Sequence, residues 1–290
     1  MKQVVFASGK GGTGKSTIVA SLSRIVHDKL LADCDVEAPD LHLLLKEETI
    51  LKRDYSGARI ARIDPTRCNA CGLCREVCRF EAIDPTPSVR PMSCEGCSAC
   101  VVVCPYQAVE LVSIKTGEIE VSRTEHGVFA QARLGIGAEG SGKLVTEVRR
   151  SLHDYQQNEE WTLIDGSPGI GCVVIASITG TDAVVAVTEP TPSGRHDLER
   201  VLSVAEHFQV PAYVCINKYD LNRQMTERIE EDCRSRGIPV IGWIPFDESV
   251  VTALQEGKTP VEADLGNIVR PIEVMWSRLV ESLSAKRCKE

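Results

Sequence analysis

Cysteines are the residues of this 290-residue chain whose spacing most clearly points to chemistry, because eight of its 13 cysteines fall within one short stretch. They form two runs, each with two residues between its first three cysteines and three residues before its fourth. The runs are Cys68, Cys71, Cys74 and Cys78, followed by Cys94, Cys97, Cys100 and Cys104. Thiolates at this spacing favour iron–sulfur clusters, whereas zinc is usually bound by separate cysteine pairs.

The spacing also predicts which thiolates share a cluster. Three cysteines two residues apart can converge on one cube, and the fourth lies too far along the chain to join them. We therefore expect each fourth cysteine to cross over. One [4Fe–4S] cluster is assigned to Cys68, Cys71, Cys74 and Cys104, and the other to Cys94, Cys97, Cys100 and Cys78. Zinc is the alternative metal, and disulfides are disfavoured in a chain without an export signal.

A second group of residues is expected to bind phosphate. Residues 9–16 read G-K-G-G-T-G-K-S, which matches G-x-x-x-x-G-K-[ST] between a predicted strand and a predicted helix. Backbone N–H groups of such a loop cradle phosphate oxygens, and the helix N-terminus adds a favourable dipole. Lys15 should reach the β- and γ-phosphates, and the Ser16 hydroxyl should bind Mg²⁺. The expected phosphate-binding residues are Gly11, Gly12, Thr13, Gly14, Lys15, Ser16 and Thr17.

The additional lysine, Lys10, makes this loop K-G-G-T-G-K-S. With it, the chain resembles the deviant Walker A ATPases, the family of MinD, ParA, Mrp and the nitrogenase iron protein. The resemblance covers residues 1–57 and 118–290. It implies ATP or ADP as the ligand, and it implies that Lys10 reaches across a nucleotide-sandwiched dimer to the partner's phosphates.

Three further segments follow predicted strands and match the same family. Asp35 matches the aspartate that orients the attacking water or the Mg²⁺ shell. Asp165 would hold Mg²⁺ through water, and Gly169 would offer its N–H to the γ-phosphate. Asn217 would hydrogen-bond adenine and Pro245 would line the base pocket, although N-K-x-D also occurs in GTPases and leaves the base open. The alternative for each aspartate is a helix cap or a turn.

Strands and helices alternate in the segments that must position these residues, which is typical of an α/β fold with a mostly parallel sheet flanked by helices. The predicted strands are Gln3–Ala7, one starting at Leu30, Trp161–Asp165, Ala183–Thr188, Ala212–Asn217 and Val240–Ile244. The predicted helices include Ser16–Asp28, Asp197–Phe208 and Asn222–Arg236, and residues 118–134 predict a hairpin with a turn near Glu125–Gly127.

The cysteine segment interrupts this pattern. We expect a P-loop ATPase domain at 1–57 and 118–290, with a small α+β domain inserted at 58–117. Residues 60–112 resemble two-cluster bacterial ferredoxins, except that Arg79 stands where the first run normally carries proline.

Other features of the sequence favour the less specific interpretation. Cys172 lies where the nitrogenase iron protein carries a cluster cysteine, but Ala138 replaces the second such cysteine, so Cys172 is predicted to be a buried small residue. Residues 137–143 repeat G-x-x-x-x-G-K, yet Leu144 follows, and we expect a flexible loop there. Cys34, Cys215, Cys233 and Cys288 are expected to be core or incidental cysteines.

The charge balance limits the partners. With 41 acidic and 33 basic residues the net charge is −8, which argues against general nucleic-acid binding and a polybasic membrane anchor. No membrane-length apolar run and no signal peptide is present, so a cytoplasmic protein is expected. Apolar residues line one face of the C-terminal helix, which predicts a helix packed on its own sheet, with membrane binding as the alternative.

Together these features predict a Mg²⁺-dependent ATPase dimer whose nucleotide state is coupled to the clusters. The dimer is a homodimer or a heterodimer with a paralogue. Its output is electron delivery to a redox partner, or cluster assembly on a metalloprotein client. The alternatives are a MinD/ParA-like spatial organiser with structural clusters, and an iron–sulfur carrier like Mrp, although the C-terminal Cys-x-x-Cys usual in Mrp is absent.

Overall fold

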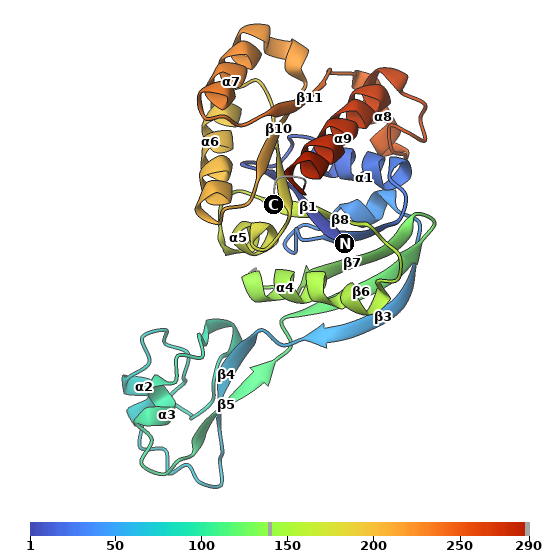
Figure 1. The fold of residues 1–290 in the computed structure, drawn as a ribbon. Helices are drawn as coiled ribbons and strands as arrows, with labels where there is room; N and C mark the ends of the chain where they lie inside the picture. Colours follow the sequence, from blue (N-terminus) through green and yellow to red (C-terminus); the bar gives the residue numbers. More distant parts are fainter. Residues whose placement is uncertain (139–140, 288–290) are drawn as a thin grey trace. The chain divides into compact units, whose positions relative to one another are not determined.

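The computed structural model describes residues 1–138 and 141–287, which divide into two compact units (Figure 1). Unit 1 comprises Met1–Lys52, Ile119–Arg133 and Gly140–Glu290, and unit 2 comprises Arg53–Glu118 and Leu134–Glu139. Both four-cysteine runs belong to unit 2. Cys288 and the middle of the second glycine-rich segment lie outside the described residues.

A nine-stranded sheet is the framework of unit 1, in the order β11-β10-β9-β1-β8-β2-β7-β6-β3. Its strands are β1 (Lys2–Ser8), β2 (Lys29–Asp33), β3 (Glu47–Tyr55), β6 (Gly117–Thr124), β7 (Gly127–Leu134), β8 (Trp161–Pro168), β9 (Ala183–Thr188), β10 (Ala212–Asn217) and β11 (Val240–Ile244). All neighbouring pairs from β11 through β2 to β7 are parallel. The expected α/β class with a mostly parallel sheet is confirmed.

Helices cover both faces of this sheet (Figure 1). They are α1 (Lys15–Ile25), α4 (Gly142–Ser151), α5 (Cys172–Ile178), α6 (Pro192–His207), α7 (Arg223–Ser235), α8 (Glu248–Gln255) and α9 (Gly266–Arg287). Because side chains alternate along a strand, Val4 and Phe6 share a buried cluster with α1 and α9, whereas the buried Val5 faces the other layer. The parallel strands therefore carry apolar residues on both faces, as strands covered on both sides do.

The apolar face of α9 is buried in unit 1. Ile272, Met275 and Leu279 are fully or almost fully buried in the core cluster with α1 and the sheet. The Trp276 ring packs edge-on against Trp161, with 4.9 Å between ring centroids. This confirms a helix packed on its own sheet. No helix among the described residues has the length and apolar character needed to cross a membrane.

Some element boundaries differ from those predicted. Helix α6 begins at Pro192 instead of Asp197, because the Thr191 hydroxyl caps it by accepting the Gly194 N–H at 3.0 Å, and proline is well tolerated in the first turn. Strand β3 was not predicted, since its residues are largely exposed and lack clear alternation. The hairpin of β6 and β7 is confirmed, with its turn at Glu125–His126.

Unit 2 is built on the antiparallel pair β4 (Ala58–Ile63) and β5 (Val109–Ile114), which the sequence did not reveal. Each cysteine run leads into a one-turn helix, α2 (Leu73–Glu76) or α3 (Ala99–Val102). The two halves repeat one backbone conformation. Left-handed residues occur at matching places in both halves, as the pairs Ala70 and Gly96, Gly72 and Ser98, and Glu81 and Gln107.

Candidate functional site

The phosphate loop lies between β1 and α1, where Lys15 is the first residue of the helix. The Lys15 side chain is 7% exposed and forms an ion pair with Asp165 on β8, the strand beside β1. Its Nζ also lies 3.4 Å from Ser16 Oγ. The structure therefore brings together the predicted phosphate lysine, the predicted Mg²⁺ hydroxyl and the predicted Mg²⁺ aspartate.

The other predicted loop residues differ in exposure and in backbone conformation. Gly11 and Gly12 are exposed, Thr13 is buried, and Gly14 has a left-handed φ of 86° just before the helix. Thr17 lies in the first turn of α1, where its carbonyl accepts the Ser21 hydroxyl at 2.8 Å. Backbone N–H groups at the start of a helix suit an anion.

A group of carboxylates adjoins Lys15. One oxygen each of Asp33, Asp40 and Asp165 lies within 4.8 Å of the others. Asp33 accepts the N–H groups of Asp35 at 2.9 Å and Leu41 at 3.1 Å, so it fixes the loop after β2. Among the described residues, Asp165 Oδ2 is buried with no hydrogen-bond partner. An orphaned buried oxygen within a carboxylate group fits a hard divalent cation such as Mg²⁺.

The electrostatics of this group follow from its burial. Burial raises the pKa of Asp165 despite the opposing charge of Lys15, and burial together with the Asp165 charge raises the pKa of Asp33 well above its ordinary value. Burial alone would lower the pKa of Lys15, but the Asp165 carboxylate raises it. Lys15 therefore remains a cation that phosphate can attract.

The predicted catalytic Asp35 and the predicted nucleotide-binding Gly169 both contact backbone groups in this structure. Asp35 is half-buried, burial raises its pKa, and its Oδ1 lies 3.4 Å from the Ala38 N–H. The Gly169 N–H donates to the Ser8 carbonyl at 2.9 Å. Donation from Gly169 to a γ-phosphate therefore requires that bond to open.

The predicted base residue Asn217 is bound to the phosphate loop. Its Nδ2 donates to the Thr13 carbonyl at 2.8 Å, and its Oδ1 accepts the Lys218 N–H at 3.0 Å. Pro245 is half-buried and follows Ile244, the β11 residue paired with Asn217. The structure brings Asn217 and Pro245 to one edge of the sheet, and the adenine contact stays a prediction.

Lys10 contacts residues that the sequence did not single out. Its Nζ lies 2.5 Å from Glu189 Oε1, and it donates to Ser193 Oγ at 3.2 Å. Glu189 directly follows β9, and Asp33 ends β2. Ligands of parallel α/β sheets bind beyond the carboxyl ends of the strands. The position of Glu189 and Asp33 at strand ends was therefore the sequence signal that could have identified them as site residues.

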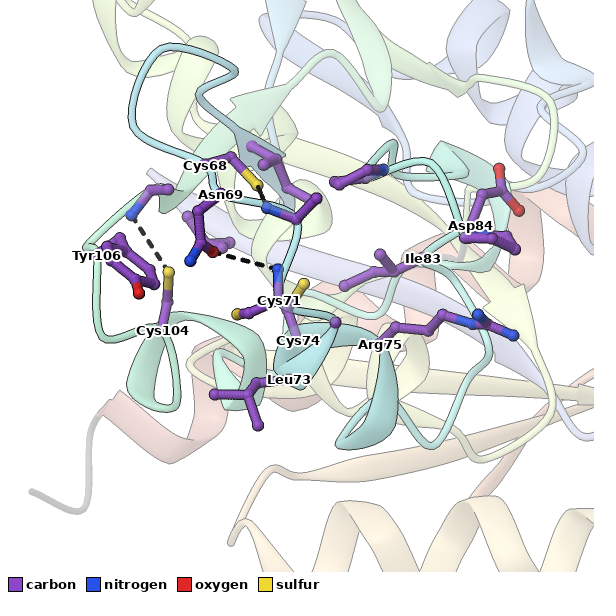
Figure 2. A pocket seen from close by; sticks show the side chains of 17 residues that line it. Cys68, Asn69, Cys71, Leu73, Cys74, Arg75, Ile83, Asp84, Cys104 and Tyr106 are labelled. Atoms are coloured by element: carbon purple, nitrogen blue, oxygen red, sulfur yellow. Dashed lines mark hydrogen bonds between the residues drawn. The ribbon is translucent and has the colours of Figure 1, made fainter.

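In unit 2 the cysteines separate into two groups of four. One cavity is lined by Cys68, Cys71, Cys74 and Cys104, and Figure 2 shows these four side chains around it, with Tyr106 beside Cys104. A second cavity is lined by Cys78, Cys94, Cys97 and Cys100. The last cysteine of each run thus lies with the first three of the other run, which is the arrangement expected from the spacing.

Backbone N–H groups point at several of these sulfurs. Ala108 donates to Cys104 Sγ at 3.3 Å, and at the matching place in the other half Ala82 donates to Cys78 Sγ at 3.3 Å. Backbone N–H donation lowers the pKa of Cys104 and so favours its thiolate. A four-thiolate donor set with N–H···S bonds fits an iron–sulfur cluster.

The remaining cysteines divide by burial. Cys34, Cys215 and Cys233 are buried as expected, and burial raises the pKa values of Cys34 and Cys215 to about 12. The prediction that Cys172 is buried is wrong, because Cys172 is exposed. It is the first residue of α5, where Val173 and Val174 instead turn inward.

Comparison with known proteins identifies the family to which this chain belongs. Residues 4–261 match the sequence model of the CobQ/CobB/MinD/ParA nucleotide binding domain, and the chain belongs to this family. It is 34% identical to the uncharacterized protein MJ0578 of Methanocaldococcus jannaschii, over 76% of this chain and 79% of that protein. It is 27% identical to MJ0579 of the same organism, over 95% of this chain and 98% of that one.

Solved structures share the fold at lower identity. The cell division protein MinD of Aquifex aeolicus gives a TM-score of 0.58 at 17% identity, with 97% of both chains covered. MinD of Pyrococcus horikoshii in complex with Mg-ADP gives 0.60 at 16% identity, with 98% of this chain and 97% of that one covered. The chain therefore has the fold and the nucleotide-binding domain of this ATPase family.

Proposed function

We propose that this protein is a Mg²⁺-dependent ATPase that works as a dimer and couples its nucleotide state to two [4Fe–4S] clusters in unit 2. The observation that carries the proposal is the division of the eight unit 2 cysteines between two cavities, four to each. Membership of the family accounts for the nucleotide-binding domain. The clusters of unit 2 are the groups whose state the bound nucleotide is proposed to control.

In the nucleotide site, the residues have distinct roles. Lys15 would bind the β- and γ-phosphates, Ser16 would hold Mg²⁺, and Asp165 would hold it through water. Asp35 positions the attacking water, and Lys10 completes the partner's site when two protomers close. Because Lys15 pairs with Asp165 in this structure, Lys15 would have to leave Asp165 in order to bind phosphate. Asn217 and Pro245 form the base side of the pocket.

In unit 2, eight thiolates hold the clusters. Each bound cluster would supply one-electron transfer. The backbone N–H groups of Ala82 and Ala108, which donate to the sulfurs of Cys78 and Cys104, orient these sulfurs and offset their negative charge. Electron delivery to a redox partner and cluster transfer to a metalloprotein client both remain open as outputs of this arrangement.

Strand pairing and the continuity of the chain connect the loop after β2 with unit 2. Strand β2, which ends in Asp33, pairs in parallel with β7, as Leu31 with Phe129 and Ala32 with Ala130. Leu134, the last residue of β7, and residues 135–138, which follow it, belong to unit 2. A rearrangement of the loop after β2 on hydrolysis can therefore act on the chain that leads into the cysteine module.

The test is anaerobic purification followed by iron and sulfide analysis and electron paramagnetic resonance. We expect about eight iron atoms per chain. Cys74→Ser and Cys100→Ser should each lose one cluster's signal, and Cys172→Ser, which lies outside both cavities, should lose none. Iron-free wild-type protein contradicts the proposal.

Coupling needs a separate measurement. ATP turnover is compared between reduced and oxidised protein, and the midpoint potential is compared with and without ATP. We expect ATP turnover to depend on the redox state of the clusters, and the midpoint potential to depend on ATP. If ATP turnover did not depend on the redox state and the midpoint potential did not depend on ATP, coupling would be excluded, and the proposed ATPase activity would still stand.

A MinD/ParA-like spatial organiser with structural clusters is the second candidate, and the fold likeness to MinD over nearly the whole chain favours it. In MinD-like proteins a C-terminal amphipathic helix binds membranes, whereas the apolar face of α9 here is buried in the core. Flotation with liposomes in the presence of ATP separates the two candidates, because our leading proposal expects the protein to stay in the unbound fraction.

A further inference from the structure

The Lys10 ammonium is bound within its own chain. Glu189 Oε1 lies 2.5 Å from Lys10 Nζ, and Ser193 Oγ accepts from it at 3.2 Å. Both partners belong to the junction between β9 and α6. Gly9 packs against α6 just beyond this junction, so closely that a Cβ at Gly9 would lie 2.7 Å from the Asp197 carbonyl oxygen. The start of the phosphate loop is therefore held against this junction by packing and by charge.

Glu189 is shared between two lysines. Lys218 Nζ lies 3.3 Å from Glu189 Oε2 and donates to the Gly12 carbonyl at 3.2 Å. The Glu189 side chain is 16% exposed and the Lys10 side chain 32%. Burial would raise the pKa of Glu189, but the hydrogen bond from Lys10 and the charge of Lys218 lower it. The carboxylate is therefore ionised and holds both ammonium groups at the loop.

We propose that Glu189 is a positioning residue that holds Lys10 inside its own protomer and thereby sets the ATP concentration at which two protomers close. This inference rests on the proposed function, in which Lys10 reaches the partner's phosphates. Lys10 cannot keep its contact with Glu189 and also bind phosphate on another chain, so closure must break this pair. The partner's triphosphate, with more negative charge than one carboxylate, is the group that competes for Lys10.

The first test measures the pair itself. In Glu189→Gln the side chain keeps its size and an acceptor oxygen but loses its charge. Without nucleotide, acetylation of Lys10, followed by mass spectrometry, should proceed about 2- to 5-fold faster than in wild type, the factor expected for loss of a partly exposed ion pair. Asp232→Asn is the matched control, because Asp232 pairs with Arg195 and not with Lys10. Equal labelling of Lys10 in all three proteins overturns the proposal.

The second test measures closure. Sedimentation velocity across a range of ATP concentrations should show Glu189→Gln dimerising at about 2- to 5-fold less ATP than wild type. In steady-state turnover the change should fall on KM more than on kcat. The shift should persist in a Lys218→Ala background, and its loss there would show that Glu189 acts through Lys218 instead.

The two tests separate the possible failures. Wild type that dimerises with ATP while Glu189→Gln shows no shift overturns the role of Glu189 and leaves the proposed function standing. Wild type that stays monomeric at every ATP concentration overturns the proposed dimer, and the role of Glu189 with it, even where labelling detects the ion pair. Should Glu189→Gln melt at a lower temperature, Glu189→Asp provides the test, with a smaller shift in the same direction.

Discussion

At the scale of single residues, the main feature of the candidate nucleotide site is a buried ion pair between Lys15 and Asp165. Burying Lys15 and Asp165 costs desolvation, and their mutual attraction offsets that cost only while both are present. Asp33 adds a second carboxylate that is fully buried yet holds two backbone N–H groups. Such a site is poised for a ligand that brings both negative phosphate and a cation.

Replacing Lys15 tests this site against a built-in control. Lys15→Ala should weaken nucleotide binding by about 10- to 100-fold, because hydrogen bonds to charged groups contribute about 1.5–3 kcal/mol. Lys143 occupies the corresponding place in the second G-x-x-x-x-G-K segment and is exposed. Lys143→Ala should leave affinity unchanged, as measured by fluorescent-nucleotide titration. Equal losses in both variants would contradict the assignment of the site.

At the scale of elements, the conformation of the phosphate loop depends on its contact with Asn217 at the end of β10. Gly14 has φ 86°, and a Cβ there would lie 2.3 Å from Asn217 Nδ2. The loop before α1 is thus fitted to the end of β10, so Asn217 contributes to loop geometry before any nucleotide binds.

Alanine at two left-handed glycines separates backbone strain from this fit. Gly180 has φ 74° with no atom within 4 Å of the Cβ position, so Gly180→Ala should cost about 1 kcal/mol. Gly14→Ala carries the same strain and the clash with Asn217, and should cost about 3 kcal/mol or more and abolish nucleotide binding. Urea unfolding and nucleotide titration measure both effects. A Gly14 variant no worse than the Gly180 variant would show that the Asn217 contact is unimportant.

Strand β2 begins with a buried lysine whose charge is costly. Lys29 is 6% exposed, and burial lowers its pKa to about 8. The unfolded chain then binds more protons than the folded chain between pH 8 and 10.5, so stability rises with pH across that window. Lys29→Met should raise the free energy of unfolding by about 2 kcal/mol at pH 7, with the gain shrinking toward pH 10.5.

Thermal unfolding at several pH values checks this expectation. Lys46→Met, at an exposed position, should change stability little at any pH. A gain for the Lys29 variant that does not depend on pH would mean that packing, and not charge, is responsible.

At the scale of the whole molecule, the two units differ in how much buried apolar core stabilises each of them. Unit 1 has a large sheet covered on both faces, whereas the buried cluster of unit 2 consists of Ala61, Ile83, Cys100 and Val109. Small domains with little apolar core usually need metals or disulfides for stability. Unit 2 should therefore depend on the proposed clusters for folding.

Removal of the clusters tests that dependence. After iron chelation under air, amide hydrogen exchange should become fast throughout residues 58–114, because metal binding free energy is then lost from folding. Exchange in β9 and β10 should stay slow and serves as the internal control. Persistent protection of β4 and β5 in iron-free protein would show that unit 2 folds without metal.

The sequence predicted those features that depend on local spacing. The phosphate loop, both cysteine runs and strands such as β9, β10 and β11 were recognised because their residues lie within a few positions of one another. Strands β3 and β4 were missed because exposed edge residues carry no hydrophobic alternation. Cys172 was misplaced because the sequence does not show which side of a helix start faces solvent.

The sequence by itself thus determined the family, and it predicted the phosphate-binding lysine and the eight cysteine ligands, since each is written in a short motif with fixed backbone geometry. Only the tertiary structure decided which groups meet across long separations. Lys10 and Ser193 are 183 positions apart, and Lys15 and Asp165 are 150 apart. Parallel strands bring their carboxyl ends to one edge whatever their order in the chain, so the partners of these lysines follow from strand order, which no local pattern encodes.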